Sequence, residues 1–291
     1  MKLTRTRAAL PRVEWLESTG STISAMRELL ADEGDAVPHG ALLATGRQTA
    51  GRGRLGRGWV SPPDTALAMS VLVRGFGAPA GAPAGAAPVP LGWLPLLAGS
   101  AVASTLQPLV GTGLRVGVKW PNDVHVRSED DAEIGSPGQK ICGILCEGIA
   151  PTSGVPGAVP DVIVGIGINV LVPEWELPTE RATSLLALDG DVGGAESFAD
   201  PLGEDLADRL LAGVAIELLS LVELARRDPA AARRRALRHS LTLGAEVRVH
   251  LPGGELVDGR ARTLADDGAL ILDLPTGGQL TVSAADVEHL R

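Results

Sequence analysis

The sequence predicts an α+β protein, in which a large domain with a mixed β-sheet is followed by a small β-barrel. Residues 12–239 combine short apolar runs typical of strands with segments whose apolar residues recur at helical spacing. From Leu241 onward the pattern changes to short alternating strands separated by glycine turns. A chain of 291 residues has room for both domains. We therefore expect a disordered lead-in over residues 1–11, a large domain over 12–239 and a small β-domain over 240–291.

The first part of the large domain is expected to begin with a strand and a helix. Apolar residues at helical spacing follow Thr22, namely Ile23, Met26, Leu29 and Leu30. Ser21 or Thr22 is placed to cap that helix, so capping alone would explain both hydroxyls. We expect strands over 12–17, 41–45 and 67–74, and a helix over 93–110 that Pro108 ends.

The next part of the chain predicts three strands and a polar turn. Strands over 114–118 and 124–127 flank the turn Lys119–Asp123. The charged segment 128–138 is expected to be a hairpin loop. Residues 141–146 are almost continuously apolar, which is typical of a central strand buried on both faces.

The rest of the large domain supplies the partner strand and the main covering helix. A strand over 162–170 pairs with the one before it, and an amphipathic helix over 202–227 packs on the sheet. The run Arg233–Arg235 indicates a solvated helix face. The Ala/Gly/Pro-rich stretch 75–90 is interpreted as a flexible surface insertion without chemistry, and 150–160 as another Gly/Pro loop.

The small domain is predicted from four alternating strands. They cover 246–250, 256–261, 269–273 and 279–282. Turns that contain glycine separate them, as expected of a compact barrel of hairpins.

Composition excludes several classes of protein. The net charge of −9 disfavours a general nucleic-acid binder. Cys142 and Cys146 lack further Cys or His partners, so we expect small buried thiols in a reducing cytoplasm and no zinc site. The N-terminus lacks the apolar run of a signal peptide, and the sequence contains no apolar stretch long enough for a membrane span.

One cationic, glycine-rich stretch is the strongest functional signal. Residues Gly46–Ser61, here called the Arg/Gly loop, read GRQTAGRGRLGRGWVS. Arginine forks and close-approaching glycine backbone suit a phosphate or a carboxylate. The spacing Gly51-x-Gly53-x-x-Gly56 matches a dinucleotide fingerprint, but the prolines that follow exclude the helix which that motif requires.

Three further segments carry polar or glycine positions at strand ends. Lys119-Trp-Pro-Asn-Asp123 places an ammonium and a carboxylate at one strand end, although turn chemistry alone would explain Asn122. Lys140 stands at the start of the buried strand, and Gly143 interrupts it. Gly165, Gly167 and Asn169 share one face of the strand 162–170, where the glycines leave a smooth floor or allow tight sheet packing.

Together these segments resemble the motifs of biotin protein ligases. The matching residues are Ser21-Thr22, GRGRLGRGW, KWPND with the later Lys140, and GIGIN, which cover residues 13–170. The family pattern has Asn after Ser-Thr, where this chain has Ile23. The resemblance implies a class II synthetase-like catalytic domain followed by an SH3-like barrel. It also implies a monofunctional ligase, because the strand near Arg12 leaves no space for the DNA-binding module of many relatives.

The resemblance also implies roles for individual residues. Catalytic roles fall to Lys140, Arg54 and Asp123. Biotin contacts are expected from Ser21, Thr22, Gln48, Gly51, Arg52, Gly53, Arg54, Lys140, Gly143 and Gly165. ATP contacts are expected from Arg54, Arg57, Trp59, Lys119, Asn122, Gly167 and Asn169.

The activity implied is ATP-dependent biotinylation through biotinyl-5′-AMP. The substrates would be ATP and biotin with Mg²⁺, without a metal site fixed by protein ligands, and the partner would be a biotin carboxyl carrier protein domain of an acyl-CoA carboxylase. We expect a cytoplasmic monomer or weak homodimer that binds neither nucleic acid nor membranes. Two alternatives remain open at this stage: a lipoate or octanoate ligase or transferase of the same fold, and a non-enzymic nucleic-acid binder.

Overall fold

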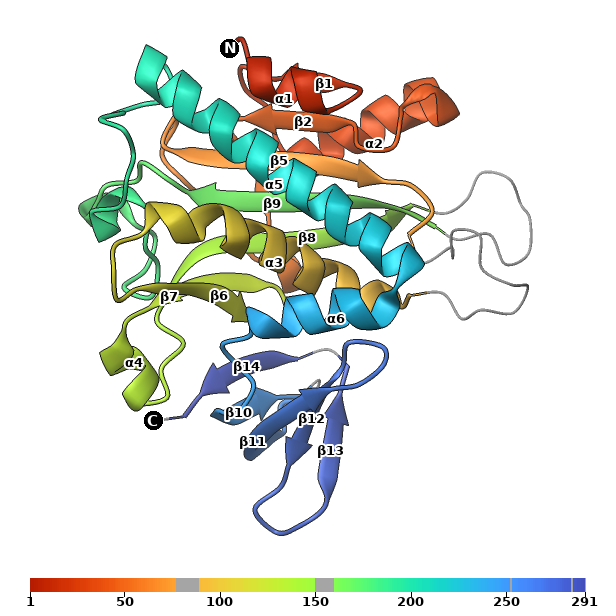
Figure 1. Cartoon of the computed structure of the whole chain (residues 1–291), viewed down its shortest axis with the longest axis vertical. Helices are drawn as coiled ribbons and strands as arrows, with labels where there is room; N and C mark the ends of the chain where they lie inside the picture. Colours follow the sequence, from red (N-terminus) through yellow and green to blue (C-terminus); the bar gives the residue numbers. More distant parts are fainter. Residues whose placement is uncertain (77–88, 150–159, 252, 284, 291) are drawn as a thin grey trace.

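The large domain is built on a seven-stranded sheet in the order β1-β2-β5-β9-β8-β7-β6 (Figure 1). The computed structural model describes residues 1–76, 89–149, 160–251, 253–283 and 285–290. Only the pair β1–β2 is parallel, and every other neighbouring pair is antiparallel. The strands are β1 Val13–Trp15, β2 Leu42–Thr45, β5 Ala66–Val73, β6 Arg115–Lys119, β7 Asp123–Arg127, β8 Gln139–Ile149 and β9 Asp161–Asn169.

Helices cover the two faces of this sheet unequally. Figure 1 shows α3, α5 and α6 lying across one face, with α1 beside α5. On the opposite face α2 packs against β2, β5 and β9, which leaves the β8–β7 side of that face open to the functional site. The helices are α1 Thr4–Ala9, α2 Thr22–Glu33, α3 Leu94–Leu106, α4 Glu129–Glu133, α5 Pro201–Arg227 and α6 Pro229–Arg238.

The alternation of side chains along β8 and β9 explains this layering. Because successive side chains point to opposite faces, Ile144 and Ile166 join the main core, while Leu145 and Ile163 belong to the smaller core under α2. Small residues let α3 approach closely, since a Cβ at Gly99 would lie 2.8 Å from a Val118 methyl carbon.

The small domain is a five-stranded antiparallel sheet in the order β13-β12-β11-β10-β14. Its strands are β10 Glu246–His250, β11 Leu256–Leu264, β12 Leu270–Asp273, β13 Gln279–Val282 and β14 Asp286–His289. Buried tryptophans join it to the large domain: Trp120 Nε1 donates to Gly268 O at 3.0 Å, and Trp93 Nε1 donates to Asp266 O at 2.9 Å.

Most predicted elements are confirmed within one to four residues, and the sequence pattern missed β14. Three expectations are wrong. Residues 1–11 are ordered, because α1 packs on α5 and the Asp208 carboxylate accepts hydrogen bonds from the Thr6 backbone and hydroxyl at 2.9 and 2.7 Å. Segment 128–138 contains the short helix α4, which Ser128 and Asp131 cap reciprocally. The run 141–146 is buried on one face only, since Gly143 and Leu145 line a cavity.

Two further expectations concern the Gly/Pro-rich insertions and the boundary between the domains. The interiors of the two Gly/Pro-rich insertions, 77–88 and 150–159, lie outside the described residues. The boundary between the domains at 239/240 stays a prediction. Among the described helices, none is both long and apolar enough to cross a membrane.

Candidate active site

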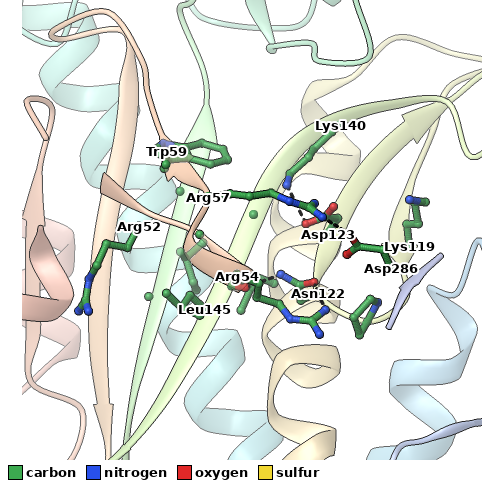
Figure 2. A pocket seen from close by; sticks show the side chains of 18 of the residues that line it. Arg52, Arg54, Arg57, Trp59, Lys119, Asn122, Asp123, Lys140, Leu145 and Asp286 are labelled. Carbon is green, nitrogen blue, oxygen red and sulfur yellow. Dashed lines mark hydrogen bonds and ion pairs between the residues drawn. The ribbon is translucent and has the colours of Figure 1, made fainter. Parts of the chain in front are cut away.

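A cavity of about 420 Å³ lies between the open face of the large sheet, the Arg/Gly loop and the small domain (Figure 2). This volume falls in the range of small-molecule sites. One wall comes from the start of α2, the floor from β8 and β9, and the outer wall from β10 and β14. The cavity is therefore built by segments that are far apart in the sequence.

The floor is created by strand register. Asp123 pairs with Gly143, Gly143 with Gly167, and Gly167 with Ala68, so four residues lie in a row across β7, β8, β9 and β5. Trp59 lies over this row. A Cβ on Gly167 would come within 2.6 Å of Trp59 Cε2, and one on Gly143 within 3.0 Å of Trp59 Cζ3. The glycines are therefore needed for the close approach of a flat ring.

Lys140 reaches the same face through a β-bulge. The register between β7 and β8 shifts so that Val124 pairs with Cys142 but His125 pairs with Lys140. The extra residue, Ile141, turns Lys140 onto the face of Asp123 and Gly143. There its Nζ lies 2.8 Å from Asp123 Oδ1 and 5.8 Å from the centre of the Trp59 ring. The sequence predicted a site at Lys140 without revealing this bulge.

Two arginines of the Arg/Gly loop point toward the end of the cavity that Lys119 and Lys140 line, here called the cationic end. Arg54 Nη1 donates to Asn122 Oδ1 at 3.0 Å, and Asn122 Nδ2 donates to Ile144 O at 2.7 Å. Asn122 thus orients Arg54 as well as closing the turn. Arg57 forms an ion pair with Asp286 of β14 (Figure 2).

Burial perturbs the cations at this end. It lowers the pKa of Lys119, an effect that Asp123 opposes and that Lys140 reinforces. Burial likewise lowers the pKa of Arg54. Both groups are held in a partly desolvated place, where an anion would restore the stability of their charged forms.

The other end of the cavity joins the Arg/Gly loop to the start of α2. Gln48 Oε1 accepts a hydrogen bond from Thr22 N at 2.9 Å, and Ser70 Oγ donates to Thr22 Oγ1 at 2.9 Å. Ser21 is the residue before the helix, but its side chain does not make a capping hydrogen bond. Gln48 therefore takes the capping role that the sequence suggested for Ser21 or Thr22.

Three predicted site residues differ in placement from the rest. Gly51 and Asn169 do not line the cavity. A Cβ at Gly51 would lie 2.4 Å from Trp59 O, so this glycine serves the β3–β4 hairpin of the loop (β3 Gly51–Arg52, β4 Gly58–Trp59). Asn169 is buried, and its Nδ2 donates to Thr183 O at 3.0 Å. Arg52 lines the cavity, but its guanidinium points away from the other cations (Figure 2).

The remaining predicted residues all line the cavity. They are Ser21, Thr22, Gln48, Gly53, Arg54, Arg57, Trp59, Lys119, Asn122, Asp123, Lys140, Gly143, Gly165 and Gly167. Sequence reasoning missed Leu145, Arg181, His250, Asp286 and Glu288. Leu145 lies two residues after Gly143 on β8 and so on the same face of the strand, which could have identified it. The residues of the small domain reach the cavity only because the two domains pack together.

The comparisons with known proteins agree with this architecture. Residues 18–169 match the model of the Biotin/lipoate A/B protein ligase family, and residues 242–290 match that of the Biotin protein ligase C terminal domain. The first match covers 152 of 291 residues, counting 18 to 169 inclusive, which is more than half of the chain.

Whole-chain relatives point the same way. The chain is 36% identical over 281 residues to the "Biotin--[acetyl-CoA-carboxylase] ligase" of Mycobacterium tuberculosis, which covers 96% of this chain and 90% of that protein. A protein of the same name from Paracoccus denitrificans is 32% identical, with 82% and 86% covered.

Solved structures share the fold. Biotin protein ligase from Aquifex aeolicus in complex with biotin and ATP gives a TM-score of 0.64 at 24% identity, covering 97% of this chain and 100% of that one. The Leishmania major enzyme in complex with biotinyl-5-AMP gives 0.52 at 24% identity, covering 94% and 99%. The α+β catalytic domain with its SH3-like C-terminal sheet is thereby confirmed, and the chain belongs to the biotin/lipoate A/B protein ligase family, with the C-terminal domain of biotin protein ligases.

Proposed function

We propose that this chain activates biotin with ATP as biotinyl-5′-AMP and transfers the biotinyl group to a lysine of a biotin carboxyl carrier domain. One observation carries the proposal: a single cavity joins a glycine floor on β8 and β9 to the cations Arg54, Lys119 and Lys140. The Trp59 ring packed on this floor would form one side of a site for a flat ligand ring. The cations suit a carboxylate and a phosphate, which repel each other until their charge is neutralised.

In the first step, a carboxylate oxygen of biotin attacks the α-phosphorus of ATP. The bond from that phosphorus to pyrophosphate breaks, and pyrophosphate leaves with the bonding electrons. We assign Lys140 to bridge the carboxylate and the α-phosphate, with Asp123 at 2.8 Å keeping its ammonium in place. Arg54, Arg57 and Lys119 would bind the phosphate oxygens, with Trp59, Asn122 and Gly167 flanking the nucleotide.

In the second step, the neutral amine of the acceptor lysine attacks the carbonyl carbon of the mixed anhydride. The bond from that carbon to the phosphate oxygen breaks, AMP leaves, and the amine nitrogen loses a proton. We assign Asp123 to orient the amine or accept that proton, because its carboxylate lies at the edge of the glycine row.

Magnesium enters the proposal as a complex with ATP. Within the described parts of the chain, His, Cys, Asp and Glu side chains do not form a group of three that could hold a metal. The acids of the cavity wall also form ion pairs, Asp123 with Lys140, Asp286 with Arg57 and Glu288 with Arg181. These residues do not form a cage for the ion, so the phosphates would carry it.

The acceptor and the setting of the enzyme follow from the same proposal. The named relatives are ligases of acetyl-CoA carboxylase, so we propose the carrier domain of such a carboxylase as the partner and the cytoplasm as the place of reaction. A monomer or weak homodimer remains our expectation.

Biotin-dependent ATP–pyrophosphate exchange tests the first step. Exchange is expected with biotin, and neither with lipoate or octanoate nor without an acid. Exchange with lipoate would instead identify a lipoate ligase, and octanoyl transfer without ATP an octanoyl transferase. Retention of labelled nucleic acid without any exchange would favour the non-enzymic binder.

A further inference from the structure

Three arginines of the Arg/Gly loop fasten it to the rest of the protein, and each binds a side chain on a different segment. Arg54 binds Asn122 in the turn before β7, and Arg57 binds Asp286 on β14. Arg52 binds Glu147 on β8, with 3.0 Å between Nη2 and Oε1. Asn122 and Asp286 line the cavity, whereas Glu147 does not. A ligand in the cavity would therefore compete for Arg54 and Arg57 but leave the contact of Arg52 intact.

Glu147 holds two guanidiniums at once. Its Oε1 faces Arg52, and its Oε2 forms an ion pair with Arg27 of α2. The Glu147 side chain is only 17% exposed, whereas Arg52 and Arg27 are 41% and 55% exposed. A carboxylate with one charged donor on each oxygen is a strong, directional anchor. It connects residues 51–59 of the Arg/Gly loop, here called the far limb, to helix α2, whose first turn forms one wall of the cavity.

Residues 47–50 of the loop, here called the near limb, are held by backbone hydrogen bonds instead. Thr19 N donates to Arg47 O at 3.1 Å, Thr49 N to Thr19 O at 2.9 Å, and Ala50 N to Gly20 O at 2.7 Å. These bonds end at Ala50. From there to Trp59 the loop backbone bonds mainly to itself, as in Gly53 N to Arg57 O at 2.6 Å. Besides the packing of Trp59 on the glycine row, the three arginine side chains therefore hold the far limb over the cavity.

We propose that Glu147 is a positioning residue for the Arg/Gly loop: it holds Arg52 in both the empty and the ligand-filled protein, and thereby keeps the loop closed over the reactive intermediate. The inference rests on the proposed function for the identity of that intermediate. Its structural part, that Glu147 restrains residues 51–59, does not.

Hydrogen exchange of the ligand-free protein tests the structural part. In Glu147→Gln, the amides of residues 51–59 are expected to exchange about tenfold faster, the ratio that corresponds to the loss of a charge-assisted hydrogen bond. Arg52→Met should speed exchange to the same extent, because it removes the more exposed partner of the Arg52–Glu147 ion pair. Glu33→Gln is the matched control, because it breaks another ion pair of α2, with Arg12, that does not involve the loop. Unchanged exchange in both Glu147→Gln and Arg52→Met would overturn the proposal.

Release of biotinyl-5′-AMP tests the functional part. After a single turnover without acceptor, Glu147→Gln and Arg52→Met should each lose the intermediate to solvent about tenfold faster than the unaltered protein. The double variant should lose it no faster than either single one, because both changes break the same pair. Additive effects, or wild-type retention in the single variants, would refute the role of Glu147. If the unaltered protein forms no biotinyl-5′-AMP, the proposed function fails instead, and the exchange result still decides on the restraint.

Discussion

At the scale of single residues, the site depends on side chains that are brought to one face of the sheet. Simple alternation would place Lys140 on the same face as Cys142, toward α3. The bulge at Ile141 reverses this, so that Lys140 meets Asp123 at 2.8 Å. The resemblance pointed to Lys140, and the structure places it at the cavity, but its route there could not be inferred from spacing.

Removing the Lys140 ammonium should slow the first step strongly. We expect Lys140→Met to slow biotinyl-5′-AMP formation about 100-fold or more, the loss typical of one preorganised electrostatic contact in an enzyme. Pre-steady-state quenching with labelled ATP measures the rate, and Lys140→Arg, which keeps the charge, should retain more activity than Lys140→Met. Equal rates in the unaltered protein and Lys140→Met would exclude Lys140 from adenylation.

The glycine row gives a second prediction at this scale. Gly167→Ala places a methyl group 2.6 Å from Trp59 Cε2, so the indole must move away from the floor. We expect ATP affinity to fall about tenfold, the effect of a local misfit of one to two kcal/mol beside the proposed nucleotide site. Gly148→Ala, on the neighbouring strand β8, is the matched control, because its Cβ would meet nothing within 4 Å. Titration of tryptophan fluorescence measures both, and equal affinities in the two variants would contradict the floor as a close-contact surface.

At the scale of elements, the arginine contacts that fasten the Arg/Gly loop differ in exposure. Arg57 and Asp286 are 64% and 38% exposed, and such surface pairs contribute only about 0–1 kcal/mol. A triphosphate carries more charge than one carboxylate and would displace Asp286 from Arg57. Asp286 links the loop to the small domain through Arg57, and under the proposed function a phosphate of ATP would take its place.

Removal of this competitor should favour the nucleotide. We expect Asp286→Asn to lower the KM for ATP by up to about fivefold, as the loss of a weak exposed pair allows, with the KM for biotin unchanged. Initial rates of biotin-dependent pyrophosphate exchange at varied ATP measure both constants. An increase in the KM for ATP would mean that Asp286 orients Arg57 productively rather than competing for it.

The elements also mark the limit of sequence reasoning. Strands and long helices were predictable because their apolar spacing records burial, as in Ile144 on β8 and Leu210 on α5. Helix α1 was missed because its burial depends on a distant carboxylate, Asp208, and α4 because its capping residues also read as a charged loop. Asn169 has the parity of the floor glycines, but the segment around Thr183 covers it.

At the scale of the whole molecule, the two domains share one site, and one buried and two half-buried histidines lie in the two domains. The small domain contributes His250, Asp286 and Glu288 to the cavity. His125 is buried on β7, and Val118 N donates to the carbonyl oxygen of His239 at 2.7 Å. His289 joins the domains, because its Nδ1 lies 3.2 Å from Gly135 O. Burial disfavours the charged forms of these histidines and lowers their pKa values, whereas the cations Arg54, Lys119 and Lys140 gather in the cavity.

This arrangement predicts a loss of stability in mild acid. Burial, followed by the charge of Lys119, lowers the pKa of His125 to about 3 and that of His289 to about 4. Burial also lowers the pKa values of His39 and His239, so four of the five histidines are affected. The unfolded chain, with histidine pKa values near 6.5, binds protons that the folded chain excludes. Stability is thus complete above about pH 6.5 and decreases as the pH falls toward the folded-state values.

The expected size of this loss can be measured. At pH 5.5, His125 and His289 together should cost about 3 kcal/mol of the free energy of unfolding relative to pH 8, about 1.4 kcal/mol for each histidine that stays neutral only when folded. Urea unfolding at intervals between pH 5.5 and pH 8 measures the decrease above the range in which ordinary carboxylates titrate. His289→Gln, which can still bond to Gly135 O and Thr242 Oγ1, should remove about 1.4 kcal/mol of it. A decrease of unchanged size in His289→Gln would show that His289 is not kept neutral at the junction of the two domains.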